Sequence, residues 1–376
     1  MNISKSRNLM LITLFVICIT APLADMVLDL DKSADLNENR ERAQLPAIKL
    51  EYGSLRKFPH AYYNYFKDNF GFRDPLIRLN FIVRHRILGE SIFNEVVFGE
   101  NDWLFYTGEK SIEDSLGITH YDEETLQRLT GSLELKRNWL SAQGIKYLFV
   151  VVPNKETVYG EWFPPYLKKV RNRTGLDEFV DYLKTHTNVD VVDLRQALLL
   201  EKKRRVFYKT DTHWNEYGAF LAYREIMKSV SRWFPVASAE TLTDFDMERK
   251  TEAGGGLAVL VGGYEFLKEE KIYLVPRKGR KAHMAEVNSD DREPFAMSQD
   301  DKRLPRALVF RDSFFNDIIP FISEQFQYAR YYWQRWDDET PIREIIEETR
   351  PDIVIEEVVE RKIKFDKTDF TGHGLP

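Results

Sequence analysis

The chain has 376 residues, a formal net charge of −6 at pH 7 and a hydrophobic content of 43%. This length suffices for one large domain with additions or for two domains, and the apolar content is ample for a packed core. Charges of both signs are interspersed along the sequence, which indicates no broad basic surface of the kind that nucleic acid requires. We therefore expect no nucleic-acid partner.

The N-terminus has the pattern of an export signal. Two basic residues precede an uncharged apolar run from Leu9 to Ala24. This order is typical of a secretory signal or a signal anchor, with the rest of the chain exported. Residues 1–27 are therefore predicted to be a signal anchor or a signal peptide. Because Pro22 would occupy a key position of a small-x-small cleavage site, we favour an uncleaved anchor. A buried helix of a cytoplasmic protein fits the basic flank less well.

The single cysteine of the chain, Cys18, lies inside the apolar run, so the rest of the chain contains no thiol. An exported remainder would hold no disulfide and no catalytic cysteine. Residues 28–46 are polar and charged and indicate a linker. We predict one functional domain over residues 47–376, in which residues 47–130 form a helical and hairpin lead-in.

The lead-in is predicted from local patterns. Apolar and aromatic residues at helical spacing occupy residues 58–88, with breaks near Gly71 and Pro75. Two apolar runs joined by Gly-Glu-Asn-Asp predict a hairpin over residues 96–106. A long amphipathic helix follows and ends at Gly144.

From residue 146 onward, apolar strands alternate with amphipathic helices. The predicted strands include residues 146–154, 189–194, 206–209, 306–310 and 351–359. Uninterrupted apolar strands between such helices predict an α/β fold, a three-layer α/β/α domain with a mainly parallel sheet. Reactive groups in such sheets gather at the carboxyl ends of the strands.

Polar residues after two of these strands form a candidate catalytic set. Asp211 and His213 follow the strand predicted at 206–209, and Ser313 follows the strand at 306–310 and opens a helix. At such a turn the serine hydroxyl is exposed, and the serine backbone N–H lies where an oxyanion would be stabilised. A nearby imidazole could take the serine proton, and a carboxylate could fix the tautomer of that imidazole.

Each member of this set also has a structural interpretation. Ser313 could cap its helix, Asp211 could cap the helix that starts near Trp214, and His213 could be a turn histidine. A metal site is a third option, but the other histidines show no ligand spacing. These histidines are His60, His85, His120, His186, His283 and His373. The pattern alone does not decide between a catalytic triad and helix-capping residues. We expect no metal and no cofactor.

Two strings point to a known family. The string from Tyr208 to Asn215, followed later by the string from Val309 to Phe314, resembles the alginate O-acetyltransferase AlgX/AlgJ family with its SGNH-hydrolase-like domain. The supporting segments are "NFGFRDPLI", "VVFGENDWLFY", "VVPNKETVYGEWFP" and "PDIVIEEVVER". The resemblance covers nearly the whole exported chain. It implies that Asp211, His213 and Ser313 form the catalytic triad.

The order of these blocks differs from that of ordinary SGNH hydrolases, in which the serine comes first and Asp-x-x-His comes last. A circular permutation would reconcile the two orders. Arg311 stands where the Gly-Asp-Ser motif has glycine, and glutamates stand where Gly-x-Asn-Asp is expected, so the usual oxyanion asparagine is missing. Candidates for the missing donor, by location only, are Arg311, Asn154 and Arg361.

The resemblance implies a periplasmic O-acetyltransferase, anchored in the inner membrane, that acts on an alginate-like or other exported polysaccharide. It also implies a membrane-bound O-acyltransferase partner as the acetyl donor, since acetyl-coenzyme A stays in the cytoplasm. Aromatic side chains could stack on sugar rings, although core packing is their commoner role; the candidates are Trp162, Tyr159 and Trp214. Two alternatives stay open, namely a periplasmic carbohydrate acetylesterase and a non-catalytic polysaccharide-binding scaffold of a secretion complex.

Overall fold

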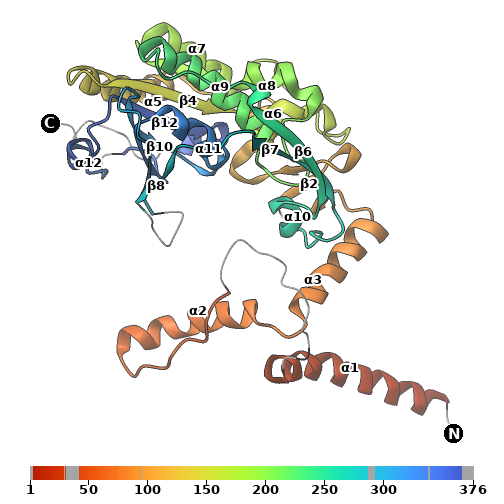
Figure 1. Ribbon diagram of the computed structural model, residues 1–376. Helices are drawn as coiled ribbons and strands as arrows, with labels where there is room; N and C mark the ends of the chain where they lie inside the picture. The colour runs from red at the N-terminus through yellow and green to blue at the C-terminus, as the bar shows by residue number, and fades with distance from the viewer. Residues whose placement is uncertain are drawn as a thin grey trace. The chain divides into compact units, whose positions relative to one another are not determined.

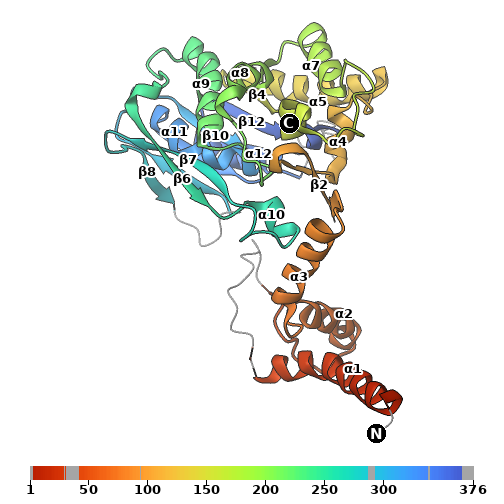
Figure 2. The same cartoon turned by 90° about the vertical axis from the view of Figure 1, so that its right-hand side faces the viewer.

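The computed structural model describes residues 3–28, 30, 42–93, 95–286, 293–337 and 339–365. The chain divides into two compact units, which are described separately (Figures 1 and 2). The N-terminal unit comprises Met1–Asn94 and Ala253–Leu267, and the sheet unit comprises Glu95–Glu252 and Lys268–Pro376. The domain limits given from the sequence stay a prediction. Most of the predicted linker, residues 31–41, lies outside the described residues.

The N-terminal unit is mainly helical. Its elements are α1 (Ile3–Leu28), α2 (Tyr52–Asp68), α3 (Arg73–Phe81), a π-helical turn (Ile82–Ile87), the short strand β1 (Ile92–Phe93) and α10 (Gly256–Leu260). The predicted break near Gly71 is confirmed, since it lies between α2 and α3. The prediction of a second break near Pro75 is wrong. Pro75 lies in the first turn of α3, where a helix leaves its backbone N–H groups without intrahelical partners and proline is tolerated.

The sheet unit is built on a seven-stranded sheet in the order β5-β4-β12-β10-β11-β9-β8. Its strands are β4 (Lys146–Val152), β5 (Asp190–Asp193), β8 (His283–Glu286), β9 (Phe295–Ser298), β10 (Arg306–Phe310), β11 (Tyr328–Tyr332) and β12 (Ile353–Val359). Strands β5, β4, β12, β10 and β11 are parallel, whereas β9 and β8 join one edge as antiparallel strands. The mainly parallel sheet of the sequence prediction is confirmed.

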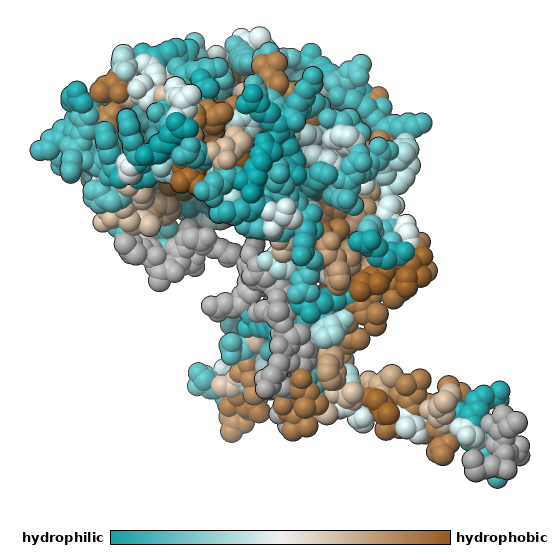
Figure 3. Space-filling model, turned by 45° about the vertical axis from the view of Figure 1, so that its right-hand side comes forward, coloured by the Kyte–Doolittle hydropathy of each residue, from teal (hydrophilic) through white to brown (hydrophobic). Residues whose placement is uncertain are grey.

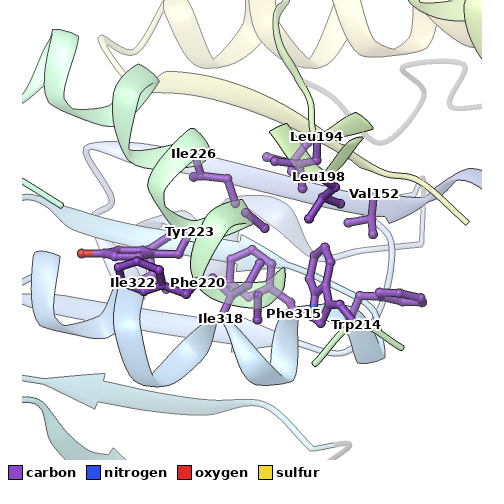
Figure 4. Close-up of a cluster of buried hydrophobic side chains, with 14 of the residues drawn as sticks. Val152, Leu194, Leu198, Trp214, Phe220, Tyr223, Ile226, Phe315, Ile318 and Ile322 are labelled. Carbon is purple, nitrogen blue, oxygen red and sulfur yellow. The ribbon is translucent and has the colours of Figure 1, made fainter. Parts of the chain in front are cut away.

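Helices cover both faces of this sheet, because its central strands are apolar on both sides. Leu148, Val150 and Val152 of β4 face one core, and the alternate residues of the same strand face the other. The first core contains side chains of α6 (Lys155–Tyr159), α8 (Arg195–Glu201), α9 (Glu216–Trp233) and α11 (Ile319–Ile322). The second contains side chains of α5 (Glu123–Ser141), α7 (Gly175–His186) and α12 (Ile342–Thr349). Figure 4 shows part of the first core.

Two hairpins and several short helices complete the sheet unit. The predicted hairpin over residues 96–106 is confirmed as β2 (Val96–Phe98) paired with β3 (Leu104–Tyr106). A second hairpin pairs β6 (Phe245–Glu252) with β7 (Glu269–Pro276). The short helices that matter below are α4 (Ser111–Ser115) and the 3-10 helices η7 (Ser313–Asp317) and η9 (Glu360–Phe365).

The prediction of a strand at residues 206–209 is wrong. This segment forms a single bridge, between Phe207 and Trp214, instead of joining the sheet. Its backbone pairs with residues just downstream, because Tyr208 N–H donates to the His213 carbonyl and Asn215 N–H donates to the Val206 carbonyl. The apolar side chains that suggested a strand are buried in the first core. The segment is therefore a closed turn that holds Asp211 and His213.

Candidate active site

Ser313 lies at the carboxyl end of β10, as predicted from the sequence. Asp312 caps η7, because its Oδ1 accepts the N–H of Phe314 at 2.9 Å. Its Oδ2 accepts the N–H of Val359, the last residue of β12, at 3.1 Å. The turn that carries Ser313 is thereby tied to the neighbouring strand, and no rearrangement is needed to present the hydroxyl.

The structure brings the three predicted triad residues into one chain of hydrogen bonds. His213 Nδ1 lies 2.7 Å from Asp211 Oδ1, and His213 Nε2 lies 2.8 Å from Ser313 Oγ. An ionised carboxylate only accepts, so Nδ1 carries the proton and Nε2 is left to accept the serine proton. The His213 side chain is 31% exposed, so reactants can reach the set from solvent.

The two capping interpretations are wrong for these residues. The N-cap of α9 is Asn215, whose side chain accepts the N–H of Gly218 at 2.9 Å. The N-cap of η7 is Asp312, not Ser313. Asp211 therefore has no helix to cap, and its Oδ1 accepts from both the ring and the backbone N–H of His213.

A buried lysine holds the turn that carries Asp211. The fully buried Lys155, at the start of α6, donates from Nζ to the carbonyls of Tyr208 at 3.3 Å and Lys209 at 3.1 Å. The same Nζ donates to the carbonyl of Asp211. Burial lowers the pKa of Lys155 to about 8, although Glu156 and Asp211 favour its charged form. Sequence reasoning missed this residue.

A glutamate of β7 holds the other side of the same turn. Glu269 accepts the backbone N–H groups of Lys209 at 2.8 Å and Thr210 at 3.1 Å, and also the Thr210 hydroxyl. The backbone before Asp211 thus has side-chain partners for both its carbonyls and its amides. Such support fixes a catalytic geometry in the way that rigid elements do. Nothing in the sequence pattern pointed to Glu269, which is distant from the turn along the chain.

Two of the three oxyanion candidates meet each other beside the serine turn. Arg361 Nη1 donates to Asn154 Oδ1 at 3.3 Å, and the Arg361 guanidinium lies 5.4 Å from the ring of Phe314. Arg361 also donates to Glu109 at 2.9 Å. Asn154 is fully buried, so its amide does not face a reactant bound at the surface. Both residues support the turn in this structure, and a role as oxyanion donors stays a prediction.

The third candidate, Arg311, is buried and held by contacts with neighbouring side chains. Its Nη1 donates to Asn316 Oδ1 at 2.5 Å, and its guanidinium lies 4.5 Å from the ring centre of Trp333. Only 2% of Arg311 is exposed. The backbone N–H of Ser313 remains as a donor, since it has no acceptor among the residues that the structure describes.

The glutamates that replace the usual Gly-x-Asn-Asp block form the framework beneath the serine turn. Burial would raise the pKa of Glu356, but Lys136 at 3.0 Å and Arg335 at 2.9 Å lower it to about 2. Glu357 accepts the N–H of Asp312 at 2.9 Å, and burial together with the Asp312 carboxylate raises the pKa of Glu357. These positions hold the strand ends in place and offer no oxyanion donor of the asparagine type.

A further carboxylate lies in the electrostatic surroundings of His213. Burial raises the pKa of Asp317 to about 6, while His213 opposes the shift and Glu216 adds to it. The residues that the structure describes include no group of three or more histidine, cysteine, aspartate or glutamate side chains arranged to hold a metal ion. Asp211 and Asp317 both contribute negative charge near His213.

The aromatic candidates for sugar stacking are largely part of the core. Trp214 is 0% exposed and Tyr159 is 3% exposed, so the suggestion that these two rings stack on sugars is wrong. Figure 4 shows Trp214 among the buried side chains beside Phe315. Trp162 is half-buried and packs against the same core. In this fold these large rings gain more free energy from burial in the core than they would at an exposed binding surface.

Part of the chain is similar to a known family. Residues 96–278 match a family described as "SGNH hydrolase-like domain, acetyltransferase AlgX". This segment of the chain is similar to the AlgX SGNH hydrolase-like family. The resemblance predicted from the sequence is thus confirmed, and so is the fold class. The matched residues include Asp211 and His213 but end before Ser313, so the assignment of the serine depends on the geometry above.

Two curated relatives carry the name "Probable alginate O-acetylase AlgJ". The one from Pseudomonas putida is 31% identical over 149 residues, which is 38% of this chain and 36% of the relative. The one from Pseudomonas fluorescens is 24% identical over 215 residues, which is 54% of this chain and 52% of the relative. The chain thus matches about half of these relatives or less.

A solved structure has the same overall fold. Bacillus cereus PatB1 superposes with a TM-score of 0.52 at 17% identity, over 71% of this chain and 96% of PatB1. At this identity the similarity establishes the fold alone. The predicted α/β/α architecture is consistent with it.

Proposed function

We propose that this chain is an O-acetyltransferase that carries an acetyl group on Ser313 and passes it to a hydroxyl of an exported polysaccharide. The observation that carries the proposal is the pair of hydrogen bonds at His213, 2.7 Å to Asp211 and 2.8 Å to Ser313. The match of residues 96–278 to the family described as an AlgX acetyltransferase domain supports an acetyl group as the one transferred.

In the first half-reaction, His213 takes the Ser313 proton as Oγ attacks the carbonyl carbon of an acetyl donor. Asp211 stabilises the imidazolium that forms, and the Ser313 backbone N–H donates to the oxyanion. The tetrahedral intermediate collapses, the bond from the acetyl carbon to the leaving group breaks, and His213 protonates that group. The product is an acetyl ester on Ser313.

In the second half-reaction, a sugar hydroxyl replaces the leaving group. His213 takes the hydroxyl proton, the sugar oxygen attacks the acetyl carbon, and the bond to Ser313 Oγ breaks as His213 returns a proton to Oγ. The result is an O-acetylated sugar and a free serine. Water in place of the sugar would make the same site an esterase.

The names of the relatives and the apolar helix α1 support a proposal for the acceptor and the location. The names of the curated relatives favour an alginate-like polysaccharide as acceptor. Residues Lys5–Met26 are long and apolar enough to cross a membrane, and their side chains are mostly exposed. We place the sheet unit in the periplasm, anchored to the inner membrane by α1. A membrane-bound O-acyltransferase would bring the acetyl group across that membrane.

The test is acetyl transfer by the purified chain from an activated acetyl ester, with and without an oligosaccharide acceptor. Acetate release and acetylated sugar are both followed by mass spectrometry. We expect acetylated sugar only with the acceptor, loss of it in Ser313→Ala, and no loss in Ser141→Ala, which changes an exposed serine at the end of α5. Acetate without acetylated sugar would identify an esterase. An active Ser313→Ala variant, or no turnover under any condition, would refute the proposal.

A further inference from the structure

We infer that α2 and the extended segment before it lie on the membrane surface, with their apolar side chains among the lipid headgroups. We call this surface the interfacial platform; it comprises Leu45, Ile48, Leu50, Tyr52, Leu55, Tyr62 and Tyr63. The inference rests on the proposed membrane anchor, α1, and adds a second membrane contact that the proposed acetyl transfer does not require.

The end of α1 is joined directly to the turn between α2 and α3. The side chain of Asp25 accepts the backbone N–H of Phe72 at 2.8 Å, and Asp25 is 8% exposed. Gly71 lies so close to α1 that a Cβ there would be 2.0 Å from the carbonyl oxygen of Pro22. Since Pro22 and Asp25 lie in the last turns of the candidate span, the carboxyl end of α2 is held at the membrane boundary.

The segment before α2 is attached at the same place. Ala43 N–H donates to Asp68 at 3.0 Å, Asn69 donates to the Ala43 carbonyl at 3.0 Å, and Arg42 pairs with Asp74 at 2.7 Å. Helix α2 has 17 residues and is therefore about 25 Å long. Residues 43–51 have to cover that length to reach its first residue, so they run extended along the helix.

The apolar side chains of α2 gather on one face of the helix. Leu55, Phe58, Tyr62 and Phe66 recur at the spacing of three and four residues that places side chains on a common face. Lys57 lies on the opposite face. A helix with this division into an aromatic and a basic side is typical of segments that lie in the plane of a membrane surface.

Several large side chains of the interfacial platform are exposed, on α2 and on the segment before it. Tyr52 is 85% exposed, Tyr63 is 62% exposed and Leu50 is 90% exposed. Large contiguous apolar patches on a protein surface mark sites of contact with a partner or a membrane. Figure 3 shows hydrophobic side chains along α1 and the neighbouring helical segments of the N-terminal unit.

The composition of the platform favours lipid over a protein partner. Tyrosine is enriched where one end of a side chain is apolar and the other meets water, as at the headgroup level. Basic residues follow the same segment and suit anionic lipid, since their stems lie along apolar surface while the charges reach phosphate. They are Lys49, Arg56 and Lys67. Because α1 delivers this segment to the boundary, a bilayer is the surface it meets first.

The experiment uses the full chain in nanodiscs that contain anionic lipid. Cys18 is replaced by serine, and single cysteines are introduced for an environment-sensitive fluorophore. Tyr63→Cys reports on the platform, Lys57→Cys on the polar face of the same helix, and Phe15→Cys on the middle of the span. Lys203→Cys, at an exposed position of the sheet unit, is the control. Spin-labelled lipids quench at the headgroup or in the acyl region.

We expect a blue-shifted emission from Tyr63→Cys and strong quenching by the headgroup label, with weaker quenching at Lys57→Cys and none at Lys203→Cys. Phe15→Cys should be quenched by the acyl label. Tyr63→Cys quenched no more than Lys203→Cys would overturn the inference, whether or not Phe15→Cys is quenched. In that case a quenched Phe15→Cys would show that the anchor stands, and a blue-shifted emission from the unquenched Tyr63→Cys would show that protein covers the platform. The acetyl-transfer assay on the same samples tests the proposed function independently.

Discussion

The buried ammonium of Lys155 donates a hydrogen bond to the backbone carbonyl of Asp211, the acid that orients His213. The same Nζ also holds the carbonyls of Tyr208 and Lys209. The turn that carries two triad members is therefore attached to α6 by one cation. Geometry at the serine depends on a side chain that touches no reactant.

Replacing Lys155 by methionine should lower kcat by about 10- to 100-fold with little change in KM, because small misplacements of reacting groups have effects of this size. The wild-type chain should also lose activity above about pH 8, where Lys155, with its pKa lowered to about 8 by burial, loses a proton and one N–H donor. Steady-state kinetics across pH measure both effects. Lys203→Met, at an exposed position, should behave as wild type, and an unchanged kcat in Lys155→Met would contradict the role.

Asp211→Asn should lower kcat by about 10³- to 10⁴-fold, because an amide can no longer fix the tautomer of His213 or stabilise its charge. The matched control is Asp317→Asn, which removes a carboxylate near His213 that makes no hydrogen bond to the ring among the described contacts. We expect that variant to keep most of its kcat and to shift only the acid limb of the pH profile. Equal losses in the two variants would argue against a specific role for Asp211.

Glu360 should make the fold less stable as pH rises. Burial raises its pKa from 4.5 to about 7, although the Asn154 N–H and the Thr157 hydroxyl oppose the shift. Between these values the folded chain binds more protons than the unfolded chain, so the free energy of unfolding falls through this window, by about 3 kcal/mol at most. Thermal unfolding at several pH values measures this slope.

Glu360→Gln is the informative variant for this prediction, since the amide is neutral at every pH. It should match wild type near pH 5 and unfold at a higher temperature than wild type near pH 8. The control is Asp352→Asn, whose carboxylate accepts the Arg306 N–H on an exposed surface. A wild-type slope that persists in Glu360→Gln would show that other groups, such as Glu357, account for it.

Gly218→Ala should damage both stability and activity. A Cβ at this position would lie 2.1 Å from the carbonyl oxygen of Val206, so α9 and the triad turn would have to separate. Overpacking of this kind costs about 1–3 kcal/mol. Gly131→Ala in α5 is the matched control, because nothing lies within 4 Å of its Cβ, and it should stabilise the helix by about 0.5–1 kcal/mol. Chemical denaturation of both variants checks the pair.

The central strands of the fold were predictable because they are buried on both faces. β4 and β10 are mainly apolar runs and β12 is apolar apart from Glu356 and Glu357, and such runs have few alternatives in a chain with regular helices between them. The segment at residues 206–209 has the same apolar character for another reason, since its side chains fill the first core while its backbone closes a turn. Periodicity does not distinguish these two causes of burial.

The triad residues could be proposed from the sequence because each has a distinctive chemical type at a strand or turn end. Their supports could not, because Lys155 and Glu269 act through backbone groups of residues that are distant along the chain. The contact between Asp25 and Phe72 was hidden for the same reason, and residues 28–46 suggested only a linker. Long-range polar contacts of this kind leave no periodic signal.

The measurement that tests the central proposal most directly is detection of the acyl-enzyme. The chain is mixed with an activated acetyl ester, quenched in acid at early times, digested and analysed by peptide mass spectrometry. We predict one acetyl group on the peptide that contains Ser313, its disappearance when an oligosaccharide acceptor is added, and its absence in Ser313→Ala. Acetylated sugar formed at the wild-type rate without acetyl on Ser313 would contradict the account.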